Sequence, residues 1–273
     1  SDGSVLSFGL ESADPNVHEK NWLNCSSNQL KTAIELINKY GRIRGERGLP
    51  TLLPGLNFIA GLNGETEKTY QMNKDLLKEI RDNGMWLRRI NIRQVEGEGF
   101  QEIPSDLFKE FKTWTRDTID APLLKELFPI GQMLSEVTWE SHDSRTRLPI
   151  HLEKEHRDTA IHGRAGVTFG RQIGAYPILI GVPYHIPLES KSNILVTGHG
   201  ARSITGVEIG LEMNSITQKQ LEAIPGIGEK SAWKLISERV KKIRKGETYD
   251  GIEDWFHDAS VEIPTLTNQI LEV

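Results

Sequence analysis

The sequence contains a single cysteine, Cys25, among its 273 residues. An internal disulfide framework is therefore excluded, and a reducing cytoplasm is the expected compartment. No apolar run approaches the length of a membrane span, and the N-terminus lacks the basic and then apolar segments of a signal peptide, so no membrane partner is expected. A P-loop, a dinucleotide-binding fingerprint, a Ser-His-Asp or Cys-His arrangement and internal repeats are also absent, which removes several common enzyme classes.

The charge is distributed unevenly along the chain, although the net charge is only −5. Residues 215–246 hold eight Lys or Arg side chains against three acidic ones, whereas residues 247–273 hold seven acidic side chains and no Lys or Arg. A basic segment beside an acidic tail is typical of an electrostatic footprint confined to one face. The cluster Lys241, Lys242, Arg244 and Lys245 is also compatible with an ordinary solvated helix face.

Three regions follow one another along the chain, and 273 residues are enough for two or three domains with their own cores. Residues 1–130 alternate short apolar runs (5–10, 56–61, 87–93) with helical periodicity (28–40, 65–80, 104–119), a pattern of βα units around a parallel sheet. Residues 131–212 hold short β-branched runs between Gly and Pro, which predict a small antiparallel sheet or barrel. Residues 213–273 are predicted to be helical.

The segment Pro225-Gly226-Ile227-Gly228 separates two short helical patterns and carries the clearest functional signal. Two glycines leave backbone amides open to a phosphate, and the second helix presents its positive dipole end to the same turn. Lys230 and Lys234, one helical turn apart, can add charge to that anion.

Capping signals mark the start of the first helix. Thr217 and Gln220 form a capping-box pattern, and Ile216 with Leu221 suits a hydrophobic staple. An αα-hairpin that only packs a small domain is the alternative interpretation of this segment.

The same segment resembles the helix-hairpin-helix motif almost position for position. The resemblance implies contact with a nucleic-acid backbone without sequence specificity, through Pro225, Gly226, Ile227, Gly228, Lys230 and Lys234.

Two further motifs lie at the predicted carboxyl ends of strands. Gly9-Leu10-Glu11-Ser12 ends the first, and Gly61-Leu62-Asn63-Gly64-Glu65-Thr66 ends the second. Together they resemble the second half of a radical S-adenosylmethionine (SAM) partial barrel, in the branch of the tRNA methylthiotransferases and related archaeal proteins with a C-terminal helix-hairpin-helix. Asn63 stands where that family usually has proline. The likeness implies contacts to SAM from Gly9, Glu11, Ser12, Gly61, Gly64 and Glu65.

The family's C-x-x-x-C-x-x-C loop is absent, and one cysteine cannot hold a [4Fe–4S] cluster in the family's way. The fold expected from the resemblance is thus α/β, a partial βα barrel of three βα units, followed by a small antiparallel β domain and a helical helix-hairpin-helix domain. The function expected is that of the C-terminal part of a radical SAM enzyme that modifies RNA, tRNA in particular, with RNA favoured over DNA. A cluster-free relative, a non-catalytic nucleic-acid-binding module and a protein-binding scaffold are the alternatives. A half-barrel would also expose an apolar face and favour self-association.

The third strand adds a basic face, because Arg89, Asn91 and Arg93 alternate with isoleucines at a period of two. In a barrel this face would look into the lumen, where Arg89 and Arg93 could bind the SAM carboxylate or a substrate phosphate. Pairing of these arginines with Glu96 or Glu98 is the structural alternative. Likewise, Glu65 is also explained as an acid favoured by the dipole of the following helix.

The middle region is similar in placement to the TRAM domain, a small tRNA-binding β-barrel. Its expected phosphate contacts are Arg171, Lys191, His199 and Arg202, although a lid is the other role considered. A set of histidines in the same region lacks the spacing of a zinc site, and a solvated linker is the preferred interpretation. The set is His142, His151, His156 and His162.

Overall fold

A computed structural model describes residues 2–95, 97, 99–101, 105–142, 166–174 and 177–272. The chain divides into two compact units, residues 1–127 with 174–176 and residues 128–173 with 177–273. No helix within the described residues is both long and apolar enough to cross a bilayer. The boundaries expected at residues 130 and 212 stay predictions.

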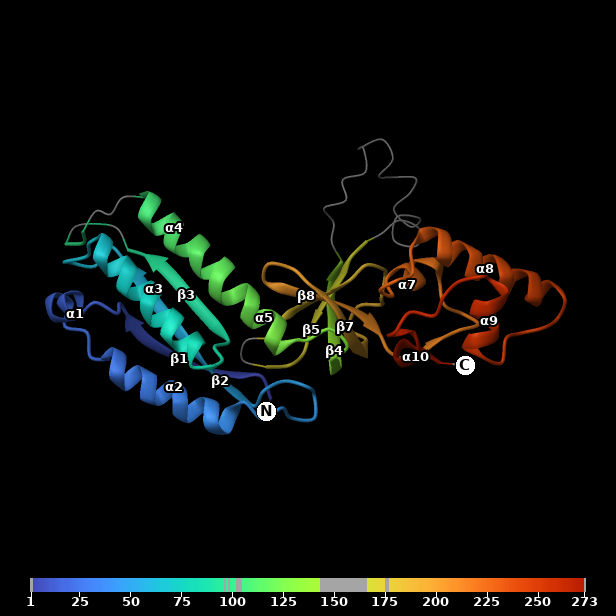
Figure 1. Cartoon of the computed structure of the whole chain (residues 1–273), viewed down its shortest axis with the longest axis horizontal. Helices are drawn as coiled ribbons and strands as arrows, with labels where there is room; N and C mark the ends of the chain where they lie inside the picture. Colours follow the sequence, from blue (N-terminus) through green and yellow to red (C-terminus); the bar gives the residue numbers. More distant parts are fainter. Residues whose placement is uncertain are drawn as a thin grey trace. The chain divides into compact units, whose positions relative to one another are not determined.

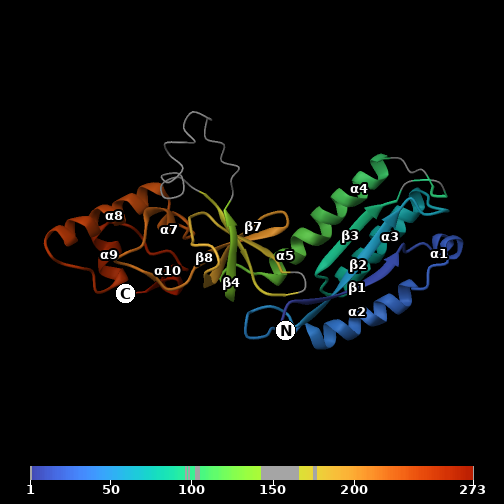
Figure 2. The ribbon, with the colours of Figure 1, turned by 180° about the vertical axis from the view of Figure 1, so that it is seen from behind.

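The first unit is a three-stranded parallel sheet in the order β1-β2-β3, with helices along it (Figures 1 and 2). Its strands are β1 (Ser4–Glu11), β2 (Leu52–Ala60) and β3 (Arg89–Gln94). Its helical elements are α1 (Pro15–Asn21), α2 (Ser27–Gly41), α3 (Glu67–Asp82), α4 (Ser105–Thr115), the π-helical turn η1 (Arg116–Asp120) and α5 (Ala121–Leu127).

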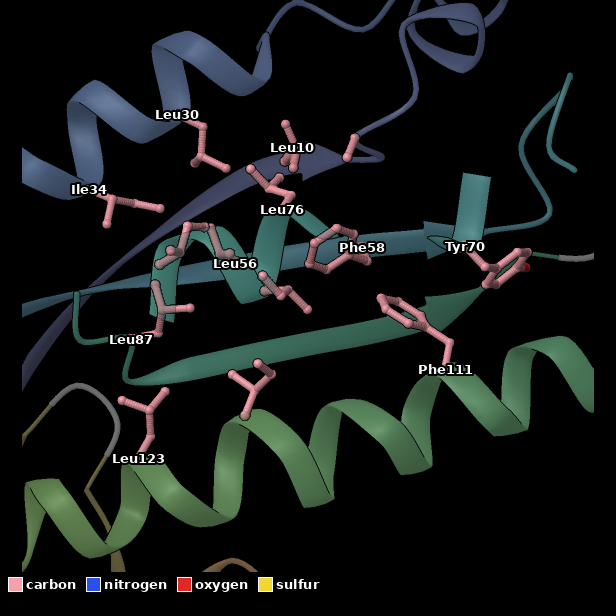
Figure 3. Packing of buried hydrophobic residues seen from close by; sticks show 14 of the residues in the cluster. Leu10, Leu30, Ile34, Leu56, Phe58, Tyr70, Leu76, Leu87, Phe111 and Leu123 are labelled. Carbon is pink, nitrogen blue, oxygen red and sulfur yellow. The ribbon is translucent and has the colours of Figure 1, made fainter. Parts of the chain in front are cut away.

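The helices bury one face of this sheet. Alternate strand residues such as Leu10, Leu56 and Phe58 point into this buried layer (Figure 3). Leu30 of α2 and Phe111 of α4 belong to the same hydrophobic cluster. Phe58 and Phe111 stack edge to face with 5.5 Å between ring centroids. The period of two along each strand sends the intervening residues to the opposite face, which is polar on β3 but carries Leu53 and Ile59 on β2.

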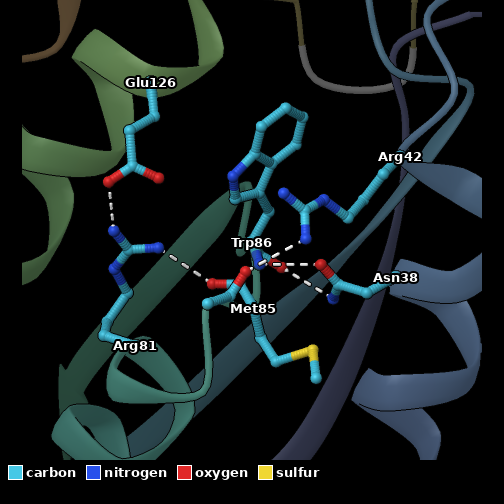
Figure 4. A network of polar contacts seen from close by, with 7 residues as sticks. Asn38, Arg42, Arg81, Met85, Trp86 and Glu126 are labelled. Carbon is cyan, nitrogen blue, oxygen red and sulfur yellow. Dashed lines mark hydrogen bonds and ion pairs between the residues drawn. The ribbon is translucent and has the colours of Figure 1, made fainter.

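Polar contacts fix the turn between α3 and β3 to its neighbours (Figure 4). Asn38 of α2 donates to the carbonyl of Trp86 at 3.0 Å and accepts from its amide at 2.7 Å. The Arg42 guanidinium lies 4.2 Å from the Trp86 ring centroid, and Arg81 pairs with Glu126. This turn is partly exposed, and its backbone hydrogen bonds to Asn38 tie the start of the third strand to α2.

The second unit contains a closed five-stranded barrel, in the order β4-β5-β6-β8-β7. Its strands are β4 (Met133–His142), β5 (Thr168–Arg171), β6 (Leu179–Val182), β7 (Lys191–His199) and β8 (Ser203–Glu208). The remaining elements are β9 (Leu211–Glu212), α7 (Gln218–Glu222), α8 (Glu229–Arg244), α9 (Ile252–Asp258), α10 (Thr267–Ile270) and β10 (Leu271–Glu272).

The predicted fold class is wrong in three respects. The first unit is an open three-stranded sheet and not part of a βα barrel. The β region is not purely antiparallel, because β6 pairs parallel to β8. This pair completes a closed barrel, which leaves no unpaired edge strand in that sheet. The C-terminal helices do not form a separate helical domain, because β10 pairs with β9 and they belong to the same compact unit as the barrel. The chain is therefore a mixed α/β protein with a parallel sheet and a mixed barrel.

Candidate functional site

The turn after β2 is closed by its own side chains. The buried Glu65 carboxylate accepts from the Gly61 amide at 3.0 Å, from the Leu62 amide at 3.2 Å and from the Tyr70 hydroxyl at 3.1 Å. Burial raises the pKa of Glu65, while the two backbone hydrogen bonds oppose that rise. Gly61 has φ +98°, where glycine is favoured, and an added Cβ would lie 2.4 Å from the Val95 carbonyl oxygen.

The remaining amides of this turn are also used. Gly64 donates to Gln101 Oε1 at 2.9 Å, and Asn63 donates to Asn21 Oδ1 at 3.0 Å. Gln101 donates from its Nε2 to the Glu65 carbonyl at 2.6 Å. The backbone amides of residues 61–65 are therefore all used within the protein, and the expected contact of this turn with SAM stays a prediction.

The turn after β1 is likewise held by local contacts. Ser12 is fully buried, and its Oγ accepts from the Asp14 amide at 3.2 Å. Asp14 in turn accepts from the Thr69 hydroxyl at 2.6 Å, and Asn73 Oδ1 accepts from the Ala13 amide at 2.7 Å. Ala13 and Asp14 thus join this turn to α3, and the buried Ser12 hydroxyl is engaged within the turn. Asn73 and Gln101 belong to no recognisable motif in the sequence, because their partners are distant along the chain.

Glu11 differs from its neighbours, since one of its carboxylate oxygens is buried without a hydrogen-bond partner within the described residues. Its backbone is left-handed at φ 66°, which is strained for glutamate. Burial raises the pKa of Glu11, and the positive charge of Arg93 opposes that rise. A Cβ added at Gly9 would lie 2.5 Å from Glu11 Oε1, so a larger residue there would move the Glu11 carboxylate.

The basic strand face is confirmed as a polar face of the sheet. Arg89 Nε donates to Asn91 Oδ1 at 2.8 Å, and Asn91 donates to Asn57 Oδ1 at 2.9 Å. Arg93 at the strand end is exposed. Glu11 and Arg93 are thus coupled by charge at the carboxyl end of the sheet, while Arg89 is engaged in the side-chain network.

The second candidate site is the hairpin formed by α7 and α8. The capping box is confirmed, because Thr217 Oγ1 accepts from the Gln220 amide at 3.3 Å and Gln220 Oε1 accepts from the Thr217 amide at 2.9 Å. Ile227 is buried at the turn and donates its amide to the Ile224 carbonyl at 3.0 Å. Pro225 is half-buried beside them. The packing of these apolar residues thus fixes the backbone conformation of the turn.

The two glycines of the turn differ in backbone conformation. Gly226 has φ +96°, and a Cβ there would lie 2.9 Å from Pro264 Cβ. Gly228 is the N-cap of α8 with φ −85° and ψ 172°, so its side-chain position is free and no side chain caps the helix. Both glycines are exposed, and no described residue accepts a hydrogen bond from their amides. The first amides of α8 therefore face solvent without a carboxylate, unlike those of residues 61–65.

Exposed cations follow the turn. Lys230 and Lys234 are exposed, and no ion pair to either is found in the part of the chain that the structure describes. In contrast, Lys241 pairs with Glu238 at 2.5 Å, and Lys242 Nζ lies 4.1 Å from the Tyr249 ring centroid. The basic cluster at the end of α8 is thus partly neutralised, whereas the lysines beside the turn are available to an anion.

Two internal contacts keep α8 in place. Arg239 Nη1 donates to the Met213 carbonyl at 3.0 Å and to the Ile216 carbonyl at 2.7 Å. Trp255 is buried and donates its indole N–H to the Leu235 carbonyl at 2.8 Å. The helix that carries the lysines is therefore anchored on its opposite face.

The barrel residues expected to contact phosphate are not gathered by any common contact. Arg171 pairs with Glu140, and His199 Nε2 bonds to the Phe128 carbonyl at 2.6 Å. Lys191 and Arg202 are exposed. His142 stacks on His185, with 4.4 Å between the rings.

Several predicted residues lie outside the described residues, namely Glu96, Glu98, His151, His156 and His162. No group of three or more His, Cys, Asp or Glu side chains suited to a metal is found in the described ranges.

Comparison with known proteins identifies two archaeal relatives and no matching family model. The chain is 37% identical over 234 residues to an uncharacterized protein of Archaeoglobus fulgidus, covering 82% of this chain and 40% of the relative. It is 36% identical over 215 residues to an uncharacterized protein of Methanocaldococcus jannaschii, covering 75% of this chain and 36% of the relative. The chain thus spans about two fifths of the length of the relatives it matches.

Proposed function

We propose that this chain binds the phosphate backbone of nucleic acid through the turn between α7 and α8, with RNA favoured over DNA. The observation that supports it most is the uncapped N-terminus of α8, where the exposed Gly228 leaves the first helical amides open. A phosphate is the anion that such amides and a positive helix end accommodate. Lys230 and Lys234 add charge at the same end of the helix.

The wider proposal concerns the longer protein, as a radical SAM enzyme that acts on RNA in the cytoplasm. It rests on the resemblance of residues 9–12 and 61–66 to that family. With Cys25 as its one cysteine, this chain lacks the thiolates for a [4Fe–4S] cluster, and the Gly61 and Leu62 amides are taken by Glu65. A non-catalytic nucleic-acid-binding module remains the alternative for this chain.

The test is a titration with bulk tRNA and with duplex DNA across a salt series. The double variant Lys230→Gln, Lys234→Gln is compared with Lys68→Gln, Lys78→Gln, which removes the same charge from two exposed lysines of α3. We expect the first variant to weaken binding and to reduce the slope of log affinity against log salt by about one for each lost phosphate contact. The control should leave the slope unchanged. If both variants lose the same affinity, or if the unmodified chain binds no nucleic acid at low salt, the hairpin does not bind a phosphate backbone and only packs the second unit.

A further inference from the structure

Trp233 is an aromatic side chain in a position where the fold gives it no structural role. It is 62% exposed, and no hydrogen-bond partner for its indole N–H occurs among the described residues. Two other tryptophans show the structural alternative. Trp255 is buried and donates to the Leu235 carbonyl at 2.8 Å, and Trp139 is buried and donates to Ser192 Oγ at 2.7 Å. A large exposed ring beside a proposed ligand site is available to contact that ligand.

The ring lies on the same stripe of α8 as the two exposed lysines. Residues three and four apart are neighbours on a helix, so Lys230 lies beside both Trp233 and Lys234, and all three side chains are exposed. The opposite side carries the buried Ala232 and Leu235. The face is thus both cationic and aromatic.

The distance to the turn suits one nucleotide. Trp233 follows the first residue of α8 by four positions, which corresponds to about 6 Å along the helix axis. Long helical side chains lean toward the N-terminus of their helix, which brings the ring closer to the open amides. A phosphate at these amides would therefore place its base within reach of the indole.

We propose that Trp233 stacks on an unpaired base, and that the hairpin therefore prefers single-stranded nucleic acid to a duplex. This inference rests on the proposed backbone binding at the turn. In a duplex the faces of the bases are covered by their neighbours, whereas a single strand can offer a base to an aromatic side chain. Because every base has such a face, the preference does not require a particular sequence.

The test measures the affinity of the whole chain for a 12-nucleotide single strand, as RNA and as DNA, and for the matching duplexes, at several salt concentrations. We expect Trp233→Ala to lower single-strand affinity about 5- to 100-fold with the salt slope unchanged, as loss of one stacked base would. Duplex affinity should stay as it was, and Trp233→Phe should keep most of the single-strand affinity. Trp22→Ala is the matched control, because Trp22 is 88% exposed in the first unit.

The outcomes separate the two proposals. If the unmodified chain binds neither single strands nor duplexes, backbone binding itself is refuted. If it binds both, and Trp233→Ala changes neither affinity or lowers both equally, backbone binding stands and the stacking role of Trp233 is overturned. A preference for duplex over single strand would also overturn it.

Discussion

Gly228 allows stability and nucleic-acid affinity to be changed in opposite directions by one substitution. This glycine is the N-cap of α8, with φ −85° and ψ 172°, a conformation open to any residue. An added Cβ meets no atom within 4 Å. In Gly228→Asp, the new carboxylate can accept hydrogen bonds from the first amides of the helix, as N-cap aspartates do. The variant would thus fill the proposed phosphate site with an anion of its own.

The expected gain in stability follows from the cap. Aspartate at an N-cap is worth about 1 kcal/mol more than alanine, which cannot accept a hydrogen bond. Gly228→Ala is therefore the matched control, because it adds a Cβ but leaves the amides open. For a unit of this size, about 1 kcal/mol corresponds to about 2–4 °C in the melting temperature.

The expected loss of affinity follows from the same atoms. Hydrogen bonds to a charged partner contribute about 1.5–3 kcal/mol, so closing the site should weaken phosphate binding about tenfold or more. Thermal unfolding followed by circular dichroism gives the first quantity, and fluorescence anisotropy with a labelled oligonucleotide at low salt gives the second. If Gly228→Asp is more stable than Gly228→Ala but the two variants bind the oligonucleotide with the same affinity, the amides do not contact phosphate. If it is less stable, the helix is not capped in the way that the backbone geometry requires.

Three further predictions concern single positions. Gly226→Ala should destabilise the second unit by about 1–2 kcal/mol, because φ is +96° and the new Cβ would lie 2.9 Å from Pro264 Cβ. A free energy of unfolding in urea within about 0.5 kcal/mol of that of the unmodified chain, roughly the size of surface effects, would contradict it. Glu65→Ala should cost about 3 kcal/mol in urea unfolding, since two amides and a tyrosine hydroxyl lose their buried acceptor, and a cost of about 1 kcal/mol or less would show that water replaces it. Burial raises the pKa of Glu208 from 4.5, so the folded state binds the carboxyl proton more tightly than the unfolded state does. The free energy of unfolding, relative to that of Glu208→Gln, should therefore fall as pH rises from 4.5 to the raised pKa and then level off, and a rise with pH would show that the pKa is lowered instead.

Features determined by neighbouring residues were predictable from the sequence. The helical pattern over residues 28–40 corresponds to α2, and the capping box at Thr217 is present with both of its hydrogen bonds. The alternation around Arg89 and Arg93 gives a polar face on β3. Each of these depends on a period or a spacing within a few residues, which the chain order already contains.

Features determined by distant pairings were not predictable in the same way. The barrel closes through the parallel pair β6 and β8, with β7 between them in the chain but on the far side of β8 in the sheet. The strand pattern shows that strands exist and does not show which of them pair. The β9 and β10 pair likewise joins the ends of the C-terminal segment, so that helices expected to stand alone belong to the unit that contains the barrel.

The two glycine turns show how the same signal can have opposite outcomes. Both combine left-handed glycine with a following helix, and both were predicted to contact a ligand. At residues 61–65 the glutamate four positions after Gly61 reaches back and takes two of those amides. At residues 226–228 the corresponding acid, Glu229, begins α8 itself and is exposed, and no hydrogen bond from it to the turn is found in the described part of the chain. A glycine turn is therefore a candidate anion site only when no acidic side chain within its own reach can occupy it, and by this criterion the hairpin is the better candidate of the two.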